Sequence, residues 1–148
     1  MNEDNDGRRV FVEAVQRMMS RWGYTPSDGK VYALLLLSDR PMRIQELAKM
    51  AGLSRSAVSL SLSKLESRYL IKMHKKGRNK LFTAVPRFFS EFLRQPREML
   101  EYEVLPAIKA LEGLNRNDVK DVLTDLNNLR CVLEKIIELE GKLECAGE

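Results

Sequence analysis

The segment from Ile44 to Val85 constrains the fold of this chain most strongly, because several local signals in it agree. Apolar residues recur at helical spacing from Ile44 and stop at Gly52, a residue suited to the sharp turn between two crossed helices. Ser54 follows, and its hydroxyl can accept a hydrogen bond from the free amides that begin a second helix. The pattern therefore predicts two helices joined by a tight turn.

A β-hairpin with a cationic tip is expected directly after the second helix. Two strand-like runs, residues 69–73 and 81–85, flank the sequence Lys-Lys-Gly-Arg-Asn-Lys at positions 75–80. Two helices followed by such a hairpin form the outline of a winged helix-turn-helix. We therefore predict a mainly α protein with a small β-hairpin wing, which makes DNA the leading candidate partner.

The charge of the chain is distributed unevenly. Residues 40–80 contain eleven Lys or Arg and two acidic residues, a net charge of +9. The whole chain carries only +4, so the remaining residues sum to −5. A basic block on an acidic frame is typical of a surface that faces phosphates, and here the block coincides with the predicted helix-turn-helix and wing.

The second helix of a docked helix-turn-helix enters the major groove with its N-terminal residues near the base edges. We expect Val58, Leu62 and Leu65 to face the core, which turns the polar side chains outward. Arg55 is the best candidate base reader, because a guanidinium can bond both acceptors of guanine. The predicted DNA-binding residues are Ser54, Arg55, Ser56, Ser59, Ser63 and Lys64 on this helix, and Lys75, Lys76, Arg78, Asn79 and Lys80 on the wing.

Long helices with apolar stripes are expected at both ends of the chain. In the final helix Val119, Leu126, Leu133 and Glu140 occupy one heptad position, and Val122, Leu129, Ile136 and Leu143 occupy the position three later. Further apolar residues widen the stripe, so this helix should pack against more than one neighbour. We expect a dimer, with a purely intramolecular helix as the alternative. The predicted dimerisation residues are Val10, Phe11, Val15, Met18, Val122, Leu126, Leu129, Leu133 and Ile136.

These elements divide the chain into three predicted parts. Residues 1–22 form an N-terminal dimerisation helix, residues 23–85 the winged helix-turn-helix, and residues 86–148 a helical dimerisation region. Helices are expected at about residues 7–22 and 27–38, and at about 87–94 and 97–111. Pro96 and Pro106 should break or kink that last stretch. One of Asn115, Asn117 and Asp118 is expected to cap the final helix.

Several function classes find no support in the sequence. The longest apolar run, residues 31–37, is far shorter than the roughly 20 residues of a membrane span, and the polar, acidic start is unlike a signal peptide. His74 is the single histidine, so a histidine-based catalytic or metal site lacks partners. Cys131 and Cys145 form no disulfide framework; we expect inert thiols, with a redox switch as the alternative. We predict a cytoplasmic protein that is not an enzyme and needs no cofactor or metal.

Three stretches resemble one known family. Residues 29–35 (Gly-Lys-Val-Tyr-Ala-Leu-Leu), 38–41 (Ser-Asp-Arg-Pro) and 53–59 (Leu-Ser-Arg-Ser-Ala-Val-Ser) are similar to the MarR-type winged-helix regulators, and most to their GbsR-like branch. The resemblance is clearest over residues 23–84. It implies a homodimer whose two heads bind a pseudo-palindromic site. It also implies transcriptional control, often repression, and a small-molecule effector of unknown identity.

Three functions remain open at this point. The leading hypothesis is a homodimeric DNA-binding transcription regulator, acting as a repressor on double-stranded operator DNA. One alternative is a winged-helix protein-interaction or assembly module whose basic face meets an acidic partner. The other is a nonspecific architectural DNA-binding protein, which would bind scrambled duplexes as well as any natural site.

Overall fold

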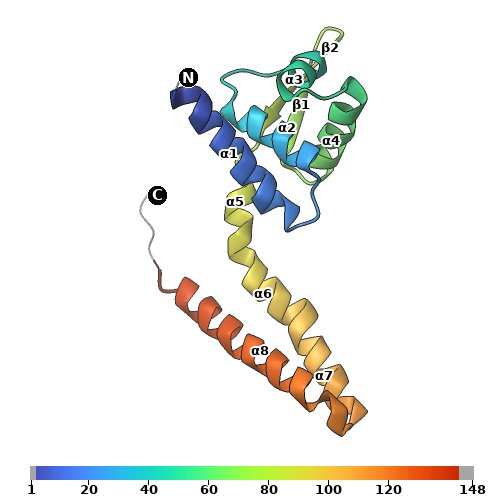
Figure 1. The fold of residues 1–148 in the computed structure, drawn as a ribbon, viewed down its shortest axis with the longest axis vertical. Coiled ribbons are helices and arrows are strands. Elements are labelled where there is room, and N and C mark those ends of the chain that lie inside the picture. The colour runs from blue at the N-terminus through green and yellow to red at the C-terminus, as the bar shows by residue number, and fades with distance from the viewer. Residues whose placement is uncertain (1–2, 144–148) are drawn as a thin grey trace. The chain divides into compact units, whose positions relative to one another are not determined.

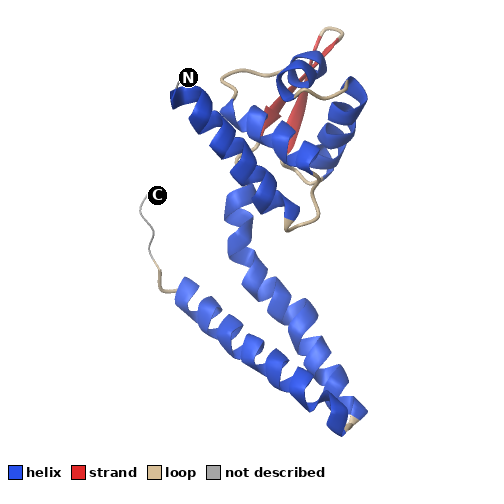
Figure 2. Cartoon of the chain, in the orientation of Figure 1, coloured by secondary structure: helices blue, strands red, loops and turns tan. Residues whose placement is uncertain are grey.

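The computed structural model describes residues 3–143, which belong to two compact units, Met1–Phe88 and Phe89–Glu148. We call the first unit the head and the second the helical unit. Figure 1 labels the elements of both, and Figure 2 separates helices from strands. Residues 3–143 are mainly helical with one two-stranded antiparallel sheet, which confirms the predicted fold class.

The head contains four helices and the hairpin. In chain order these are α1 (Glu3–Ser20), α2 (Pro26–Leu37), α3 (Ile44–Ala51), α4 (Arg55–Ser67), β1 (Ile71–Lys76) and β2 (Asn79–Ala84). The first helix begins at Glu3, four residues before the expected start. Its first turn carries Glu3, Asp4 and Asp6, and carboxylates are favourable at the positive end of a helix dipole.

Close packing of α1 on α2 depends on Gly29. A Cβ atom added at Gly29 would lie 2.8 Å from the Cα atom of Gln16, which is closer than side-chain carbons approach a backbone. Thr25 begins α2 with a capping box, in which its hydroxyl accepts from the Asp28 amide and the Asp28 carboxylate accepts from the Thr25 amide. The start of α2 is therefore held both by its own cap and by α1.

All the helices of the head contribute to one apolar core. Its most deeply buried large side chains are Val15, Met19, Val31, Tyr32, Leu47, Val58 and Leu65. Tyr32 has no exposed surface, and its hydroxyl donates to the Val85 carbonyl at 2.7 Å. This bond ties α2 to the segment that leaves the hairpin, and Phe88 packs edge-on against the Tyr32 ring. Burial of Val58, Leu62 and Leu65 confirms the predicted inner face of α4.

The turn between α3 and α4 has the geometry that its glycine allows. Gly52 is in the left-handed conformation, φ 67° and ψ 34°, and the Leu53 amide donates to the Ala48 carbonyl at 3.0 Å. These features end α3 in the manner common for glycine-terminated helices. Ser54, two residues after Gly52, is the N-cap of α4, as predicted from the sequence.

The hairpin pairs Ile71 with Ala84 at its base and Lys76 with Asn79 at its tip. Gly77 has φ 65° at the first central position of the two-residue turn, where a type II′ turn needs a positive angle. Met42 adds an isolated bridge to Phe82, with amide-to-carbonyl distances of 2.9 and 2.8 Å in the two directions. The segment before α3 therefore anchors the hairpin, whose tip extends beyond the helices of the head (Figure 2).

The short helix α5 (Phe88–Glu91) spans the boundary between the head and the helical unit. The elements of the helical unit are η1 (Phe92–Arg94), α6 (Gln95–Met99), η2 (Leu100–Val104), α7 (Leu105–Leu114), η3 (Asn117–Val119) and α8 (Lys120–Glu140). The segment from η1 to α7 is one irregular helical run, and α8 returns beside it.

The two prolines interrupt this run as predicted. Pro96 lies in the first turn of α6, directly after the 3-10 turn η1. Pro106 lies in the first turn of α7, directly after η2, which is a π-helical turn. Proline has no amide hydrogen and its ring collides with the preceding turn, so a wider or tighter turn before it relieves both problems. The expected side-chain cap of α8 is wrong: Val119 is its N-cap residue and makes no side-chain cap bond.

The two heptad positions of α8 have different environments. Leu133 is buried against Leu100 and Val104 of η2 and Ile108 of α7, and Leu126 is partly buried there. The other position is exposed; its members Val122, Leu129 and Ile136 retain 53%, 39% and 39% of their surface. Leu133 was predicted as a dimerisation residue, and this is corrected, because it is buried in the core of the helical unit of a single chain. Leu126 is only partly buried, so its role in a dimer stays a prediction.

The same correction applies to one residue of α1. Val15 was predicted to contact a second copy, but it has no exposed surface within the head. Val10 remains half exposed, and Phe11 and Met18 are partly exposed. The apolar stripe of α1 is therefore shared between the core of the head and its surface.

Candidate nucleic-acid interface

The recognition helix α4 is capped and oriented by its first residues. Ser54 has extended backbone angles, φ −71° and ψ 157°, and its Oγ atom accepts from the Ala57 amide at 3.1 Å. The Ser56 hydroxyl lies 3.2 Å from the same oxygen. The cap satisfies one of the free amides at the start of the helix and leaves Arg55, the first helical residue, exposed.

The outward face of α4 consists mostly of small hydroxyl side chains. Ser56, Ser59 and Ser63 are exposed there, as predicted, because Val58 and Leu62 occupy the opposite face. Small side chains allow a helix to lie deep in the major groove, where its ends can reach base edges and phosphates. This face has the composition that a DNA-reading helix needs.

Lys64 is partly exposed and also makes contacts within the head, so its role in DNA binding stays a prediction. Its Nζ atom lies 3.1 Å from Oδ2 of Asp28, donates to the Gly23 carbonyl at 3.0 Å, and is 5.0 Å from the centre of the Tyr24 ring. All three partners are on the loop before α2 or in its first turn. Lys64 therefore stabilises the position of α4 on the head.

Asp28 is the centre of this polar cluster, and sequence inspection missed it. Its side chain is only 5% exposed, and it accepts from the Ser61 hydroxyl at 2.7 Å and from the Thr25 amide at 2.9 Å. Burial by itself raises the pKa of the Asp28 carboxyl. The hydrogen bonds from Thr25, Ser61 and Lys64 outweigh that effect, so the pKa of Asp28 lies below its ordinary value.

The wing presents all its predicted residues to solvent. Lys75, Lys76, Arg78, Asn79 and Lys80 are exposed along the tip of the hairpin. Several carboxylates within residues 3–143 form ion pairs. Their partners are other cations, and none of these partners is Arg55 or one of the wing residues. Their charge is therefore available to an external anion, and its attraction to DNA depends on salt because phosphate contacts release counterions.

The recognition helix and the wing lie next to each other. Ser59, Ser63 and Glu66 of α4 line one side of a hollow of about 170 Å³, and Met73 and Lys80 of the hairpin line the other. The structure thus brings predicted residues of both elements to one surface of the head. Arg68, at the end of α4, instead lies with its guanidinium 5.6 Å from the centre of the Tyr24 ring.

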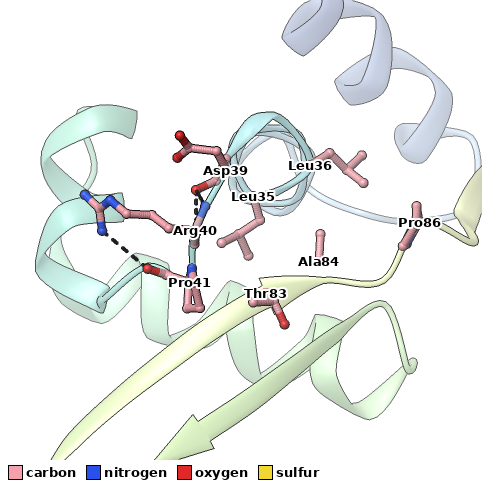
Figure 3. A pocket seen from close by; sticks show the side chains of 9 residues that line it. Leu35, Leu36, Asp39, Arg40, Pro41, Thr83, Ala84 and Pro86 are labelled. Carbon is pink, nitrogen blue, oxygen red and sulfur yellow. Dashed lines mark hydrogen bonds between the residues drawn. The ribbon is translucent and has the colours of Figure 1, made fainter. Parts of the chain in front are cut away.

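A second hollow of about 240 Å³ lies between the loop after α2 and strand β2 (Figure 3). The loop is held by the Ser38 hydroxyl, which donates to the Arg40 carbonyl at 2.6 Å. Arg40 is itself paired with Glu46 at 2.5 Å, and its guanidinium lowers the pKa of that carboxyl. The polar groups of this hollow are thus largely engaged within the head.

The chain has two cysteines. Cys131 is exposed on α8 and carries a free thiol, and Cys145 lies outside the described residues. Among the residues that the structure describes, no three His, Cys, Asp or Glu side chains come together as metal ligands. No helix in this part of the chain is long and apolar enough to cross a bilayer.

A protein-family model matches part of the chain. Residues 19–87 match the family model described as "Sugar-specific transcriptional regulator TrmB". These residues run from the end of α1 to the residue after Pro86, so they contain the helix-turn-helix and the wing. No curated protein is significantly similar to the chain.

Comparison with solved structures gives the fold. A structure described as a transcriptional regulator is 20% identical, covers 92% of this chain and 94% of its own, and has a TM-score of 0.62. MepR, a transcription regulator of the Staphylococcus aureus multidrug efflux pump MepA, is 16% identical over 85% and 99% of the two chains, with a TM-score of 0.43. ZitR of Lactococcus lactis in complex with DNA is 18% identical over 76% and 75%, with a TM-score of 0.38.

The first of these structures shows that the chain has the fold of a winged-helix regulator. The family match of the head and the exposed, unpaired cations of the wing support the same interpretation. These observations support the interpretation of the chain as a DNA-binding regulator of transcription.

Proposed function

We propose that the chain is a cytoplasmic repressor that acts as a homodimer on a pseudo-palindromic operator. The observation that carries the proposal is the surface formed by the start of α4 and the tip of the wing. It combines a capped helix, an outward face of serines, and exposed cations without carboxylate partners in the described residues. Arg55 reads bases in the major groove, and Arg78 of the wing reaches an adjacent minor groove.

The dimer proposal is supported by the exposed stripe of α8. Val122, Leu129, Val132, Ile136 and Leu139 are between 39% and 55% exposed, and they recur at alternating spacings close to three and four residues. That spacing is the seam pattern of two packed helices, and the only polar residue that interrupts it is Asp125. A second copy of the same helix would cover this stripe. The exposed stripe therefore supports a symmetric dimer.

A symmetric dimer sets the geometry of the operator. Two heads related by a twofold axis bind two half-sites that lie about one helical turn apart, roughly 10 base pairs from centre to centre, or a multiple of that distance. The finer placement of the chain in the GbsR-like branch of MarR-type regulators is also part of the proposal, and it rests on residues 29–35 and 53–59.

The decisive experiment measures fluorescence anisotropy on the duplex upstream of the protein's own gene. A scrambled duplex of equal length is measured beside it, and both are titrated across a salt series. We expect the natural duplex to bind at least ~10³-fold more tightly, with affinity falling as salt rises. Equal affinity for both duplexes would support the architectural alternative, and absence of binding at low salt would support the protein-interaction alternative.

Repression is tested separately from binding. A reporter gene is placed behind the same upstream duplex, and its transcription is measured in a purified system with increasing protein. We expect transcription to fall over the concentration range in which anisotropy shows binding. A rise in transcription over that range would show an activator and contradict the repressor assignment.

A small-molecule effector is the last part of the proposal. The description of the matched family model names sugars, which makes mono- and disaccharides the first class to test. A ligand that binds only the native protein raises its melting temperature as its concentration exceeds Kd. An effector should both raise the melting temperature and weaken operator binding, and a panel that does neither would exclude this ligand class.

A further inference from the structure

We infer that Leu60 is a specificity-determining residue of the recognition helix, and that it reads the C5-methyl group of thymine in the major groove. Leu60 is 74% exposed, although leucine is among the residues most often buried. The inference rests on the proposed DNA-binding function and deepens it, because it adds a contact of a different chemical kind to the same surface.

The position of Leu60 on α4 is the first support. The helix buries Val58, Ser61, Leu62 and Leu65, so residue 60 projects from the side opposite to the core. Ser56 precedes it by four residues and Ser63 follows it by three, which places both beside it on the same helix face. The predicted base-reading surface therefore includes Leu60.

The size of its neighbours is the second support. All the exposed residues that flank Leu60 on this face, Ser56, Ser59, Ser63 and Ser67, are serines. Leu60 therefore extends farther from the helix axis than any of them. When this face enters the major groove, Leu60 therefore reaches the base edges before the serines do.

The chemistry of the groove identifies the target. Base edges in the major groove offer hydrogen-bond donors and acceptors, and one apolar group, the C5-methyl of thymine. A leucine side chain has no polar atom with which to replace the water on a donor or acceptor. It gains free energy only by covering the methyl group, so Leu60 should favour thymine at one position of each half-site.

This contact has a signature that differs from those of the charged residues. Transfer of one methyl group out of water changes an equilibrium constant about four-fold. Since the contact is apolar, that factor should not depend on salt, whereas phosphate contacts from lysine weaken as salt rises. The contribution of Leu60 can therefore be separated from the general attraction between the basic wing and DNA.

The test uses deoxyuridine, which differs from thymidine only in lacking the C5-methyl group. A preferred duplex is first selected from random sequences with the wild-type full chain. Each thymine is then replaced by deoxyuridine in both half-sites together, and affinities are measured by anisotropy for wild type, Leu60→Ala and Leu60→Met. Met50→Ala is the matched control, because Met50 is a half-exposed apolar residue of another helix of the head.

We expect one thymine position at which the paired replacement weakens wild-type binding about fifteen-fold, four-fold for each half-site. Leu60→Ala should bind the thymine duplex more weakly by a similar factor and should not distinguish thymine from deoxyuridine there. Leu60→Met keeps an apolar side chain and should retain most of the discrimination. Met50→Ala should behave as wild type, and circular dichroism should show that all variants melt cooperatively.

Four results would overturn the inference. They are a selected duplex without thymine in the half-sites, wild-type indifference to every deoxyuridine, a Leu60→Ala protein that still discriminates thymine, and unchanged affinity of Leu60→Ala for the thymine duplex. The last result would show that Leu60 does not contribute to DNA binding. In all four cases wild type still prefers the selected duplex. Failure of wild type to prefer any duplex would instead overturn the proposed function, and the inference with it.

Discussion

The Nζ atom of Lys64 lies 3.1 Å from the Oδ2 atom of Asp28, so the recognition helix is paired with the first turn of α2. Ser61 donates to the other oxygen of the same carboxylate at 2.7 Å. Asp28 is almost fully buried, and no buried side-chain nitrogen or oxygen among the described residues lacks a hydrogen-bond partner. A satisfied polar cluster of this kind restricts α4 to one orientation on the head, in which its serine face is exposed to solvent.

Replacement of Asp28 should therefore destabilise the head. In Asp28→Asn the ammonium of Lys64 loses its carboxylate partner, and we expect the free energy of unfolding to fall by about 2 kcal/mol. Urea denaturation followed by circular dichroism measures this change. Asp39→Asn, in an exposed loop, is the control and should change stability little.

The same carboxylate makes a pH prediction. The pKa of Asp28 is lower in the folded chain than in the unfolded chain, so the unfolded state binds the proton more readily. The stabilising contribution is complete above the ordinary aspartate pKa of about 3.9 and is lost as pH falls through the folded value. The stability difference between wild type and Asp28→Asn should be constant from about pH 7 to pH 5 and shrink below about pH 4. A constant difference down to about pH 2 would contradict the role of the ionised carboxylate.

Arg55 and Lys75 should differ in what they contribute to DNA binding. Arg55→Ala should cost about 1–3 kcal/mol on the preferred site and relax base preference at one position. Lys75→Ala should weaken binding to all sequences alike. It should also reduce the slope of log affinity against log salt by about two, because each of the two heads neutralises one phosphate fewer. Anisotropy on preferred and scrambled duplexes across salt separates the two. An equal loss for Arg55→Ala on both duplexes would contradict base reading.

Substitutions of Ile136 and Leu133 should have different consequences, because the two residues lie on different faces of α8. Ile136→Glu places a charge on the exposed stripe, so we expect a folded monomer by light scattering, with helix content retained. Leu133→Ala leaves a cavity in the core of the helical unit, and we expect a loss of about 3 kcal/mol in stability instead. A wild-type monomer at micromolar concentration, or an unchanged mass for Ile136→Glu, would exclude this seam as the dimer contact.

Tyr69 should be a site at which glycine stabilises the protein. It follows the end of α4 with φ 62°, and the Leu70 amide donates to the Leu65 carbonyl at 2.9 Å, which is the pattern of a helix end that normally carries glycine. Because the Tyr69 side chain is 73% exposed, its removal sacrifices little packing. Tyr69→Gly should raise stability by about 0.5–1 kcal/mol in thermal unfolding. Tyr69→Ala retains the strained backbone and should show no such gain.

The local elements of the head could be predicted because their signals lie within a few residues of one another. Gly52 and Ser54 define the turn and the cap through their own backbone and hydroxyl chemistry, and the glycine in the wing turn has the positive φ that the hairpin requires. The +9 charge of residues 40–80 likewise depends on composition alone. Such features need no knowledge of distant contacts, so the sequence by itself determined the helix-turn-helix, the wing and the basic surface.

The roles of Lys64 and Asp28 depended on contacts between segments far apart in the chain. The sequence gives no sign that the Lys64 ammonium lies 3.1 Å from a carboxylate 36 positions earlier in the chain. The heptad pattern of α8 likewise shows two apolar positions, and it cannot distinguish the position that packs within the chain from the position that stays exposed. Leu133 and Ile136 have the same periodicity and hydrophobicity, and only the packing of Leu133 against Leu100, Val104 and Ile108 separates them. Tertiary contacts made this choice because burial depends on which surface meets the helix, and a one-dimensional pattern contains no information about that partner.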